Sequence, residues 1–429
     1  MSRDSFEEQW LADLPSEWVQ HRADFLCQSY RVTVDPERFG DDLVAHYSIP
    51  QVQETGGPAI ETASDIASLK LLIKEPTLLV SKLNPRKSTI CIAIPDPSYP
   101  TLASSEFVAL SSDKFDQKYA YYLWSSEKVR DRLSALTQSA TRSHQRVNPA
   151  DITKIIWKWP SLDTQQRIAR FLDEKTARID MLIEKKQALL NRLAEKRQAL
   201  ITRAVTKGLN PDVPMKPSGV DWLGDIPSHW DLLPLRRVTR KVTTGRTPPS
   251  ALADYFTDGD VNWFTPGDFG DGMELCDSER KIASTAIDDG VVSLYPSGTV
   301  FLVAIGATLG KVAIAKEPGS ANQQVNAMIM EGRNSPQFLA YFIEGFRNEV
   351  RVTSNGNTLA ILNQDGTKSL MVLKPPVEEQ EAISAFLIGQ DQQDLIVIGE
   401  VERSCQLLVE YRAALVSVAV TGQLPELNE

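Results

Sequence analysis

The chain has 429 residues, of which 42% are hydrophobic and 24% are charged, and its formal net charge at pH 7 is −10. This length suits two or three domains, each with a core of its own. No run of about 18 apolar residues occurs and the N-terminus is polar, so the sequence predicts neither a membrane span nor a secretory signal. Because the four cysteines and four histidines are widely scattered, we expect a reducing, cytoplasmic location and no metal site.

Charge is distributed unevenly along the chain. Residues 161–209 carry a formal charge of +5 and residues 375–429 carry −8, whereas blocks 19–160 and 231–374 are close to neutral, at +1 and −2. The whole-chain average therefore hides one basic and one acidic segment. It does not by itself exclude a nucleic-acid-binding protein.

The sequence contains an internal repeat of about 215 residues. Trp10–Trp18 (WLADLPSEW) reappears as Trp222–Trp230 (WLGDIPSHW). Glu195–Thr206 reappears as Glu410–Thr421, with seven of twelve positions identical. The pattern predicts two copies of one unit that are alike at their ends and divergent in their middles.

Each copy ends in a predicted long helix. The first begins after Pro160, where Asp163 and Gln166 have the spacing of a capping box, and both helices end at a glycine that is soon followed by a proline. Inside the helices, seam positions recur in alternating steps of three and four, which is typical of a coiled coil. The predicted seam residues are Ile183, Leu190, Leu193, Leu200, Ile398, Val401, Leu408 and Leu415.

The opposite charges of the two helices favour their pairing with each other, and a two-fold relation between two copies makes that pairing antiparallel. Separate amphipathic helices, each packed on its own domain, are the alternative.

The middle blocks mix short β-branched segments with helices and Pro/Gly turns. We predict strands at 78–83, 89–94, 299–304 and 311–315, and helices at 118–136 and 336–350. The predicted fold is α+β: two duplicated globular heads joined by a pair of long antiparallel coiled-coil helices, with pseudo-two-fold symmetry. The predicted boundaries are 1–160 for the first head, 161–208 for the first long helix, 209–221 for a linker, 222–375 for the second head and 376–429 for the second long helix.

The order of these motifs resembles that of the DNA-specificity subunits of type I restriction–modification enzymes, which have two target-recognition domains. Thr244–Pro248 (TGRTP) is similar to the family's Gly-x-Thr-Pro entry into such a domain, and Trp263–Asp268 to its Trp-x-x-x-x-Asp stretch. Ile305–Val312 followed by Asn322–Gln324 is similar to its Gly-Lys strand and Asn-Gln signature. The resemblance covers essentially the whole chain.

The resemblance implies a non-catalytic subunit that reads an asymmetric, bipartite target in double-stranded DNA, one half-site per head. Its implied partners are two modification (methyltransferase) subunits, which methylate adenine N6, and restriction subunits, which translocate and cleave DNA. No cofactor is expected in this chain, because S-adenosylmethionine, ATP and Mg²⁺ would be bound by the partners. The residues themselves show no catalytic motif: Gly306–Val312 lacks the spacing and the Ser/Thr of a phosphate loop.

The candidate DNA-contacting residues are cationic, amide and hydroxyl side chains of predicted loops, because such groups contact phosphates and base edges. In the first head they are Lys82, Arg86, Lys87, Arg142, His144, Gln145 and Arg146. In the second head they are Arg246, Thr247, Asn322, Gln323, Gln324, Asn355 and Asn357.

Two alternatives stay open. Each of these loops could be a solvated polar turn, and residues 321–324 could equally satisfy buried backbone groups. At the level of function, a two-headed coiled-coil scaffold that binds protein rather than DNA is also compatible with the duplication and the net charge of −10.

Overall fold

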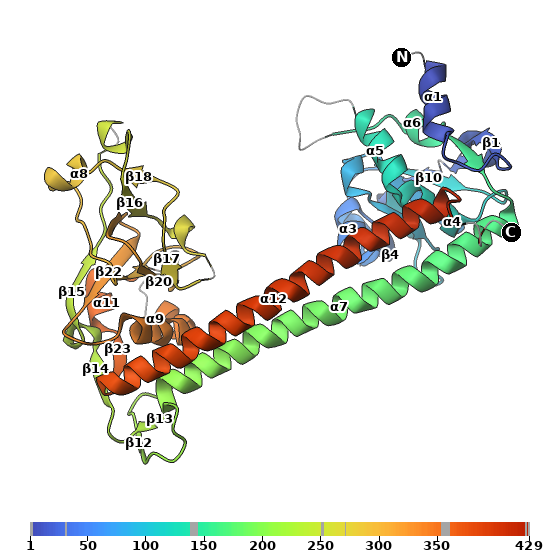
Figure 1. Cartoon of the computed structure of the whole chain (residues 1–429). Helices are drawn as coiled ribbons and strands as arrows, with labels where there is room; N and C mark the ends of the chain where they lie inside the picture. The colour runs from blue at the N-terminus through green and yellow to red at the C-terminus, as the bar shows by residue number, and fades with distance from the viewer. Residues whose placement is uncertain are drawn as a thin grey trace. The chain divides into compact units, whose positions relative to one another are not determined.

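The computed structural model describes residues 3–30, 32–137, 145–249, 253–270, 272–352, 361–424 and 427 (Figure 1). They belong to two compact units: unit 1 is residues 1–187 with 402–429, and unit 2 is residues 188–401. Each unit therefore holds one head together with a part of both long helices. Among the described residues, no helix is both long enough and apolar enough to cross a membrane.

The core of unit 1 is an antiparallel four-stranded sheet in the order β2–β10–β7–β8. Its strands are β2 (Gln28–Tyr30), β7 (Thr77–Ser81), β8 (Ile90–Ala93) and β10 (Phe107–Ser111). A second, mixed sheet in the order β3–β6–β9–β4–β5 consists of β3 (Thr33–Val34), β4 (Leu43–Tyr47), β5 (Ala59–Thr62), β6 (Lys70–Ile73) and β9 (Thr101–Ser104). A separate antiparallel pair joins β1 (Val19–Arg22) to β11 (Ile156–Trp159).

The helices of head 1 are short, and α4 packs against β7 and β8. They are α1 (Arg3–Leu11), α2 (Ala23–Leu26), α3 (Ile49–Thr55), α4 (Gln117–Ser125), α5 (Glu127–Ala135) and α6 (Pro149–Thr153), with 3-10 helices η1 (Pro36–Phe39), η2 (Ala63–Asp65) and η3 (Pro85–Lys87).

The core of unit 2 is a five-stranded sheet in the order β15–β22–β19–β20–β17, next to a three-stranded sheet in the order β18–β16–β21. Their strands are β15 (Thr239–Thr244), β16 (Val261–Phe264), β17 (Glu274–Leu275), β18 (Lys281–Ile282), β19 (Val300–Val303), β20 (Val312–Ala315), β21 (Gly319–Ala321) and β22 (Val325–Met330). Two strand pairs join β12 (Met215–Pro217) to β13 (Asp225–Pro227) and β14 (Asp231–Pro234) to β23 (Met371–Lys374).

The helices of head 2 are also short. They are α8 (Thr285–Asp288), α9 (Pro336–Gly345), α10 (Arg347–Val352) and α11 (Gln364–Ser369), with 3-10 helices η4 (Leu235–Arg237), η5 (Ala253–Phe256) and η6 (Pro266–Asp268).

The internal repeat is visible in the strand order. β2–β10–β7–β8 of unit 1 corresponds to β15–β22–β19–β20 of unit 2, and the β1–β11 pair corresponds to β14–β23. The sheets outside this shared core differ, with five strands in unit 1 and three in unit 2. The fold is thus α+β, as predicted, with a common core and a head-specific second sheet.

Two long helices complete the units: α7 (Leu162–Lys207) and α12 (Val377–Val420). In unit 1 the first part of α7 contributes Ile168 and Leu172, and the last part of α12 contributes Ala419 and Val420, to one hydrophobic cluster. In unit 2 the last part of α7 and the first part of α12 contribute to the hydrophobic cluster instead. The helices run antiparallel within each unit, since the start of one shares a core with the end of the other.

Each long helix is fixed to its head by a buried glutamine near its start. Gln165 and Gln380 are both 2% exposed, and each donates from Nε2 to the carbonyl of the proline five residues earlier. The Oε1 of Gln165 accepts from the backbone N–H of Asp116, and the Oε1 of Gln380 from that of Ser335, both at 2.8 Å. Asp116 and Ser335 are the N-caps of α4 and α9, so one amide side chain ties two helix starts together in each unit.

The C-terminal end of each long helix packs against the tryptophan motif of the repeat. Gly422, after α12, has φ 69°, and a Cβ there would lie 2.5 Å from Pro15 Cγ and 2.7 Å from Trp18 Cζ2. Gly208, after α7, has φ 74°, and a Cβ there would lie 3.3 Å from Trp230 Cζ2. Both the left-handed backbone and the close indole favour glycine at these positions. The two best-conserved parts of the internal repeat are therefore in contact with each other.

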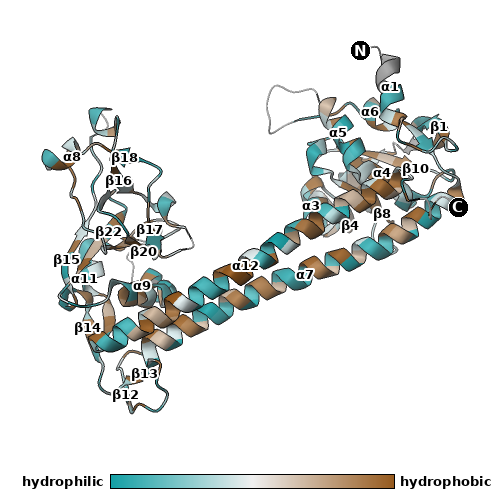
Figure 2. Ribbon diagram, viewed as in Figure 1, coloured by the Kyte–Doolittle hydropathy of each residue, from teal (hydrophilic) through white to brown (hydrophobic). Residues whose placement is uncertain are grey.

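Hydrophobic residues recur along both long helices (Figure 2). Reduced exposure follows a strict spacing along them. The less exposed residues of α7 in this series are 179, 183, 186, 190, 193, 197, 200 and 204. Those of α12 are 387, 391, 394, 398, 401, 405, 408, 412, 415 and 419. These are alternating steps of four and three, the repeat of a coiled-coil seam. All eight predicted seam residues lie on these positions.

The helix predicted over 336–350 is divided into α9 and α10. Two further local predictions were wrong. The cap of α7 is Ser161, whose Oγ accepts from the backbone N–H of Thr164 at 3.2 Å, rather than the predicted Asp163. The helix predicted over 118–136 is divided into α4 and α5 at Ser126, which is buried and caps α5 through Val129 N–H. In both cases a serine hydroxyl satisfies a free N–H group that the apolar pattern does not reveal.

We expect Gln380→Leu to destabilise the protein by about 1–3 kcal/mol, because it leaves the buried N–H of Ser335 and the carbonyl of Pro375 without their partner. Chemical denaturation followed by circular dichroism would measure the loss. Gln393→Leu, at an exposed site of the same helix, is the matched control. Equal effects of the two substitutions would contradict the proposed role of Gln380.

Candidate nucleic-acid interface

In head 2, the three motifs singled out in the sequence converge on one place. Backbone N–H groups of Gly245 and Arg246, after β15, donate to the carbonyls of Val325 (2.9 Å) and Ala321 (2.8 Å) on either side of the β21–β22 turn. The indole Nε1 of Trp263, on β16, donates to the carbonyl of Arg246 at 3.1 Å. These contacts hold the Gly245–Thr247 segment between the β21–β22 turn and β16.

Gly245 is required by this close approach. A Cβ at this position would lie 2.2 Å from the carbonyl oxygen of Asn322 and 2.3 Å from that of Ala321. Those atoms belong to the backbone and cannot move aside as a side chain would. The glycine of the TGRTP motif therefore has a packing role, and the residues that follow it are the ones presented to solvent.

The candidate residues of head 2 differ in their exposure. Arg246, Thr247, Gln323 and Gln324 are exposed, and the Thr247 hydroxyl donates to Gln323 Oε1. Asn322 is only 6% exposed: its Oδ1 accepts from Gln324 N–H (2.9 Å) and its Nδ2 donates to Gln324 Oε1 (3.1 Å). Asn322 shapes the turn, while its neighbours provide the accessible polar groups.

Asp268 also has a structural role. Its Oδ2 accepts from the backbone N–H of Thr265 at 2.7 Å and its Oδ1 from that of Glu279 at 2.7 Å. The aspartate of the Trp-x-x-x-x-Asp stretch thus ties η6 to the segment that leads into β18.

In head 1, the structure brings together two loops that lie more than 60 residues apart in the sequence. Asn84 N–H donates to the carbonyl of Gln145 (2.8 Å), and Val147 N–H donates to that of Lys82 (2.9 Å). The turn that carries Arg86 and Lys87 is therefore adjacent to the segment that carries Gln145 and Arg146. Asn84 and Ser88, which flank the turn, both have φ 47°.

Glu106 organises the cations at this place. Its Oε1 lies 2.6 Å from Arg146 Nη2 and its Oε2 lies 3.9 Å from Lys82 Nζ. Lys82 also donates to the carbonyl of Ser105 at 2.7 Å. Arg86 and Lys87 are exposed and form no ion pair with other described residues, so they are the cations available for a phosphate.

The repeat identifies a counterpart of this basic turn that the sequence analysis assigned no role in binding. The bond from Leu362 N–H to the Ala304 carbonyl (2.8 Å) in head 2 corresponds to the bond from Val147 to Lys82 in head 1. The residues that follow Ala304, 305–310, therefore occupy the place of the basic turn. In the sequence, corresponding residues are 215 positions apart at Val147 and Leu362 but 222 positions apart at Lys82 and Ala304. This change of offset is hard to recognise, because the middles of the two copies are divergent.

The remaining candidates lie outside the described residues. They are Arg142, His144, Asn355 and Asn357. Among the described residues, no group of three or more His, Cys, Asp or Glu side chains is arranged to hold a metal ion.

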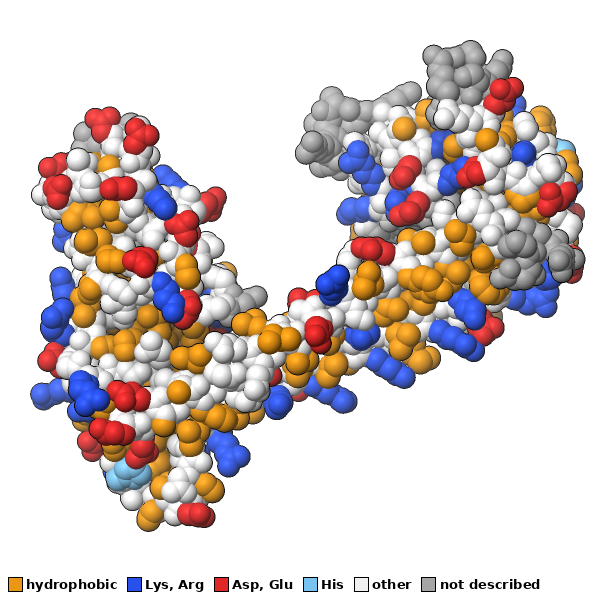
Figure 3. Space-filling view, viewed as in Figure 1, with side chains coloured by type: hydrophobic (Ala, Val, Ile, Leu, Met, Phe, Trp, Pro, Cys, Tyr) orange, Lys and Arg blue, Asp and Glu red, His pale blue; other side chains and the backbone are white. Residues whose placement is uncertain are grey.

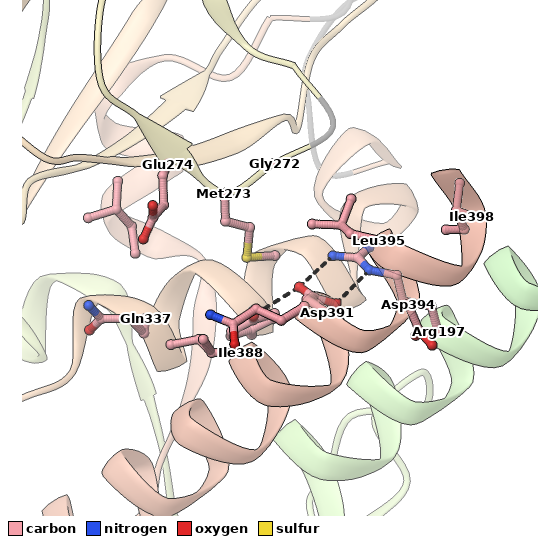
Figure 4. Close-up of a pocket in the computed structure, with 13 residues that line it drawn as sticks. Arg197, Gly272, Met273, Glu274, Gln337, Ile388, Asp391, Asp394, Leu395 and Ile398 are labelled. Atoms are coloured by element: carbon pink, nitrogen blue, oxygen red, sulfur yellow. Dashed lines mark hydrogen bonds and ion pairs between the residues drawn. The ribbon is translucent and has the colours of Figure 1, made fainter. Parts of the chain in front are cut away.

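A polar network fixes the helix pair in unit 2 (Figure 4). Arg197 donates from Nε and Nη2 to the two carboxylate oxygens of Asp391, at 2.8 and 2.9 Å, and Tyr341 Oη donates to Asp391 Oδ2 at 2.9 Å. Burial raises the pKa of Tyr341, and the charge of Asp391 raises it further, so the phenol stays protonated. In unit 1, Arg412 on α12 pairs with Asp180 on α7 at 2.8 Å.

These arginines occupy corresponding seam positions, 215 residues apart. A charged residue in a seam favours one register of two helices, since a shifted register would bury it unpaired. The Arg197–Asp391 pair borders a cavity of about 270 Å³ that is also lined by Met273, Ile388, Leu395 and Ile398.

Comparison with known proteins agrees with this architecture. Residues 227–396 match the family model of the type I restriction modification DNA specificity domain. The chain is 28% identical over 169 residues to the type I restriction enzyme MjaIX specificity subunit of Methanocaldococcus jannaschii, covering 38% of each protein. It is 27% identical over 154 residues to the EcoprrI specificity subunit of Escherichia coli, covering 35% of this chain and 37% of the relative. These two alignments span less than two fifths of the relatives' length.

Wider similarities cover the whole chain. The MjaX specificity subunit of M. jannaschii aligns over 98% of this chain and 97% of its own length at 20% identity. A chain from a structure described as the basis of complex assembly and conformational transition of a type I restriction–modification system has a TM-score of 0.77 at 18% identity, covering 96% of this chain and 99% of its own. The HsdS subunit of Thermoanaerobacter tengcongensis has a TM-score of 0.53 at 17% identity, covering 96% and 98%.

We expect Arg197→Met to lower the stability of the protein by about 1–3 kcal/mol, because Asp391 would keep only its bond to Tyr341 in a half-buried site. The double variant Arg197→Met/Asp391→Leu should regain most of this loss, since apolar residues can replace a buried ion pair. Chemical denaturation measures both, with the exposed Arg203→Met as control. Equal destabilisation by the single and double variants would contradict this account.

Proposed function

We propose that this chain, which belongs to the DNA-specificity subunit family of type I restriction–modification enzymes, reads an asymmetric, bipartite DNA target, one half-site per head. The observation that carries the proposal is the duplicated core with different second sheets. The two heads share a four-strand order but present different surfaces beyond it. Two such surfaces would select two different half-sites.

Each head contributes a set of polar groups suited to DNA. In head 1 the cations Arg86 and Lys87 are free for phosphates, and Arg146 and Gln145 lie next to them. In head 2 Arg246 and Thr247 lie on a segment held between the β21–β22 turn and β16, and Gln323 of that turn accepts from the Thr247 hydroxyl. Rigid placement favours specificity, because a base contact requires a donor within a few tenths of an ångström of its acceptor.

The long helices provide the surface on which we expect the modification subunits to dock. In unit 2 exposed apolar side chains gather on α12, and in unit 1 on the last part of α12 and on α7 (Figure 3). They are Phe386, Ile388, Leu395, Ile396 and Val397 in unit 2, and Met181, Leu182, Leu407, Val409 and Tyr411 in unit 1. Apolar patches of this kind on a protein surface are typical of interfaces. Exposed apolar side chains on the long helices of both units fit two copies of one partner.

In this proposal the chain has no catalytic role. S-adenosylmethionine would be bound by the modification subunits, and ATP with Mg²⁺ by restriction subunits that join the complex. The place of action is the cytoplasm, where the host DNA is found.

Removing the two free cations of head 1, with Arg86→Ala/Lys87→Ala, should weaken DNA binding by the complex of this chain with its modification subunits. Because each lost phosphate contact removes about 0.9 from the slope of log K against log salt, the slope should fall by about 2. The sequence of the methylated site should stay unchanged. Fluorescence anisotropy at several salt concentrations measures the slope, with the exposed Lys114→Ala as control. An unchanged slope would contradict this use of the turn.

Placing charge on the apolar patch of unit 2, with Leu395→Asp/Ile396→Asp, should weaken the binding of one modification subunit at least tenfold, since two apolar side chains would no longer be buried. Native mass spectrometry of the purified complex should then find one modification subunit in place of two. Gln393→Asp is the matched control on the same helix. Two subunits retained at equal affinity would exclude this patch as a docking surface.

A further inference from the structure

Arg280 of head 2 lies on an aromatic platform. Its guanidinium carbon is 5.0 Å from the ring centroid of Phe256 and 5.3 Å from that of Trp263. The two rings meet edge to face, with centroids 5.9 Å apart. The two distances from the guanidinium carbon to the rings are within the range of a cation–π interaction. The flat guanidinium can stack on a ring while its N–H edge stays open.

The platform is rigid and joined to the motif cluster. Trp263 is 3% exposed, and its Nε1 is bonded to the carbonyl of Arg246. The backbone of Arg280 is fixed too, because its carbonyl accepts from the Ser278 hydroxyl at 2.7 Å. Arg280 itself is exposed. Its side chain therefore lies on the same tryptophan that binds the backbone of Arg246.

The charges around Arg280 make a purely electrostatic role unfavourable. The described residues among 253–290 include nine carboxylates but only two cations, Arg280 and Lys281. Lys281 pairs with Asp277 at 3.0 Å, whereas Arg280 forms no ion pair with other described residues. So many carboxylates would repel phosphates. A contact with DNA here has to come from a specific, directional interaction instead.

We infer that Arg280 reads a guanine in the half-site recognised by head 2, donating two N–H bonds to O6 and N7 in the major groove. Bidentate arginine–guanine contact needs a planar donor pair with fixed orientation, and the stack on Phe256 and Trp263 supplies that orientation in advance. The inference rests on the proposed function of the chain. It adds one specificity-determining residue of head 2, Arg280, and the base that this residue reads.

The test is the methylation specificity of the complex of the full chain with its modification subunits, acting on a library of DNA with randomised half-sites. Sequencing of the methylated sites gives both half-sites. With Arg280→Ala, one position of the head 2 half-site should lose its preference for guanine at least tenfold, and the head 1 half-site should be unchanged. Lys281→Ala, which alters the neighbouring cation, should leave both half-sites unchanged.

A second variant separates base reading from a structural role. Glutamine makes its bidentate contact with adenine, so Arg280→Gln should move the preference at that position from guanine towards adenine. A folding defect would lower the rate of methylation without changing the base. A wild-type head 2 half-site without guanine, or variants that keep the wild-type motif, would overturn the inference. A wild-type complex that methylates no defined motif would instead refute the proposed function itself.

Discussion

The structure depends on the antiparallel pairing of α7 and α12, in which each helix begins in the core of one unit and ends in the core of the other. Two buried features fix the beginning and the end of each helix. A glutamine side chain joins the start of the helix to the N-cap of a head helix, and a glycine lets the end of the helix lie against a buried tryptophan. Both features occur twice, 215 residues or a little less apart. The repeat in the sequence therefore reflects these two pairs of contacts at the ends of the helices.

The constraint explains which parts of the chain are free to vary. The glycines, the tryptophans and the seam arginines contact partners in the other copy of the repeat. The glutamines bind the N-cap of a head helix in their own copy. The units differ most in the second sheets of the heads, which have five strands in unit 1 and three in unit 2. A subunit of this kind can therefore change the surface of one head while the paired helices and the shared four-strand core stay as they are.

Much of the fold could be predicted from the sequence, because the repeat and the heptad spacing are both long-range patterns. The seam positions of Leu190 or Val401 follow from a periodicity sustained over six turns. Local features were less accessible. The cap at Ser161 and the break at Ser126 depend on which hydroxyl reaches a free N–H, and several residues near each site have suitable side chains.

The candidate site was predicted in its residue types but not in its arrangement. Polar loops in both heads were identified, yet composition could not distinguish Gln323, which is exposed, from Asn322, which is bonded inside its own turn. The adjacency of the Lys82–Lys87 turn to Arg146 is a tertiary contact, and Glu106 joins them through space. Nothing in the spacing of Phe256, Trp263 and Arg280 shows that they stack, because the three lie on separate elements.

The most direct test of the central claim is a genome-wide map of N6-methyladenine by long-read sequencing in cells that express this chain with its modification subunits, before and after deletion of its gene. The account predicts that one gapped motif with two different half-sites is methylated in the first case and lost in the second. Continued methylation of every motif after deletion, with active modification subunits present, would contradict it.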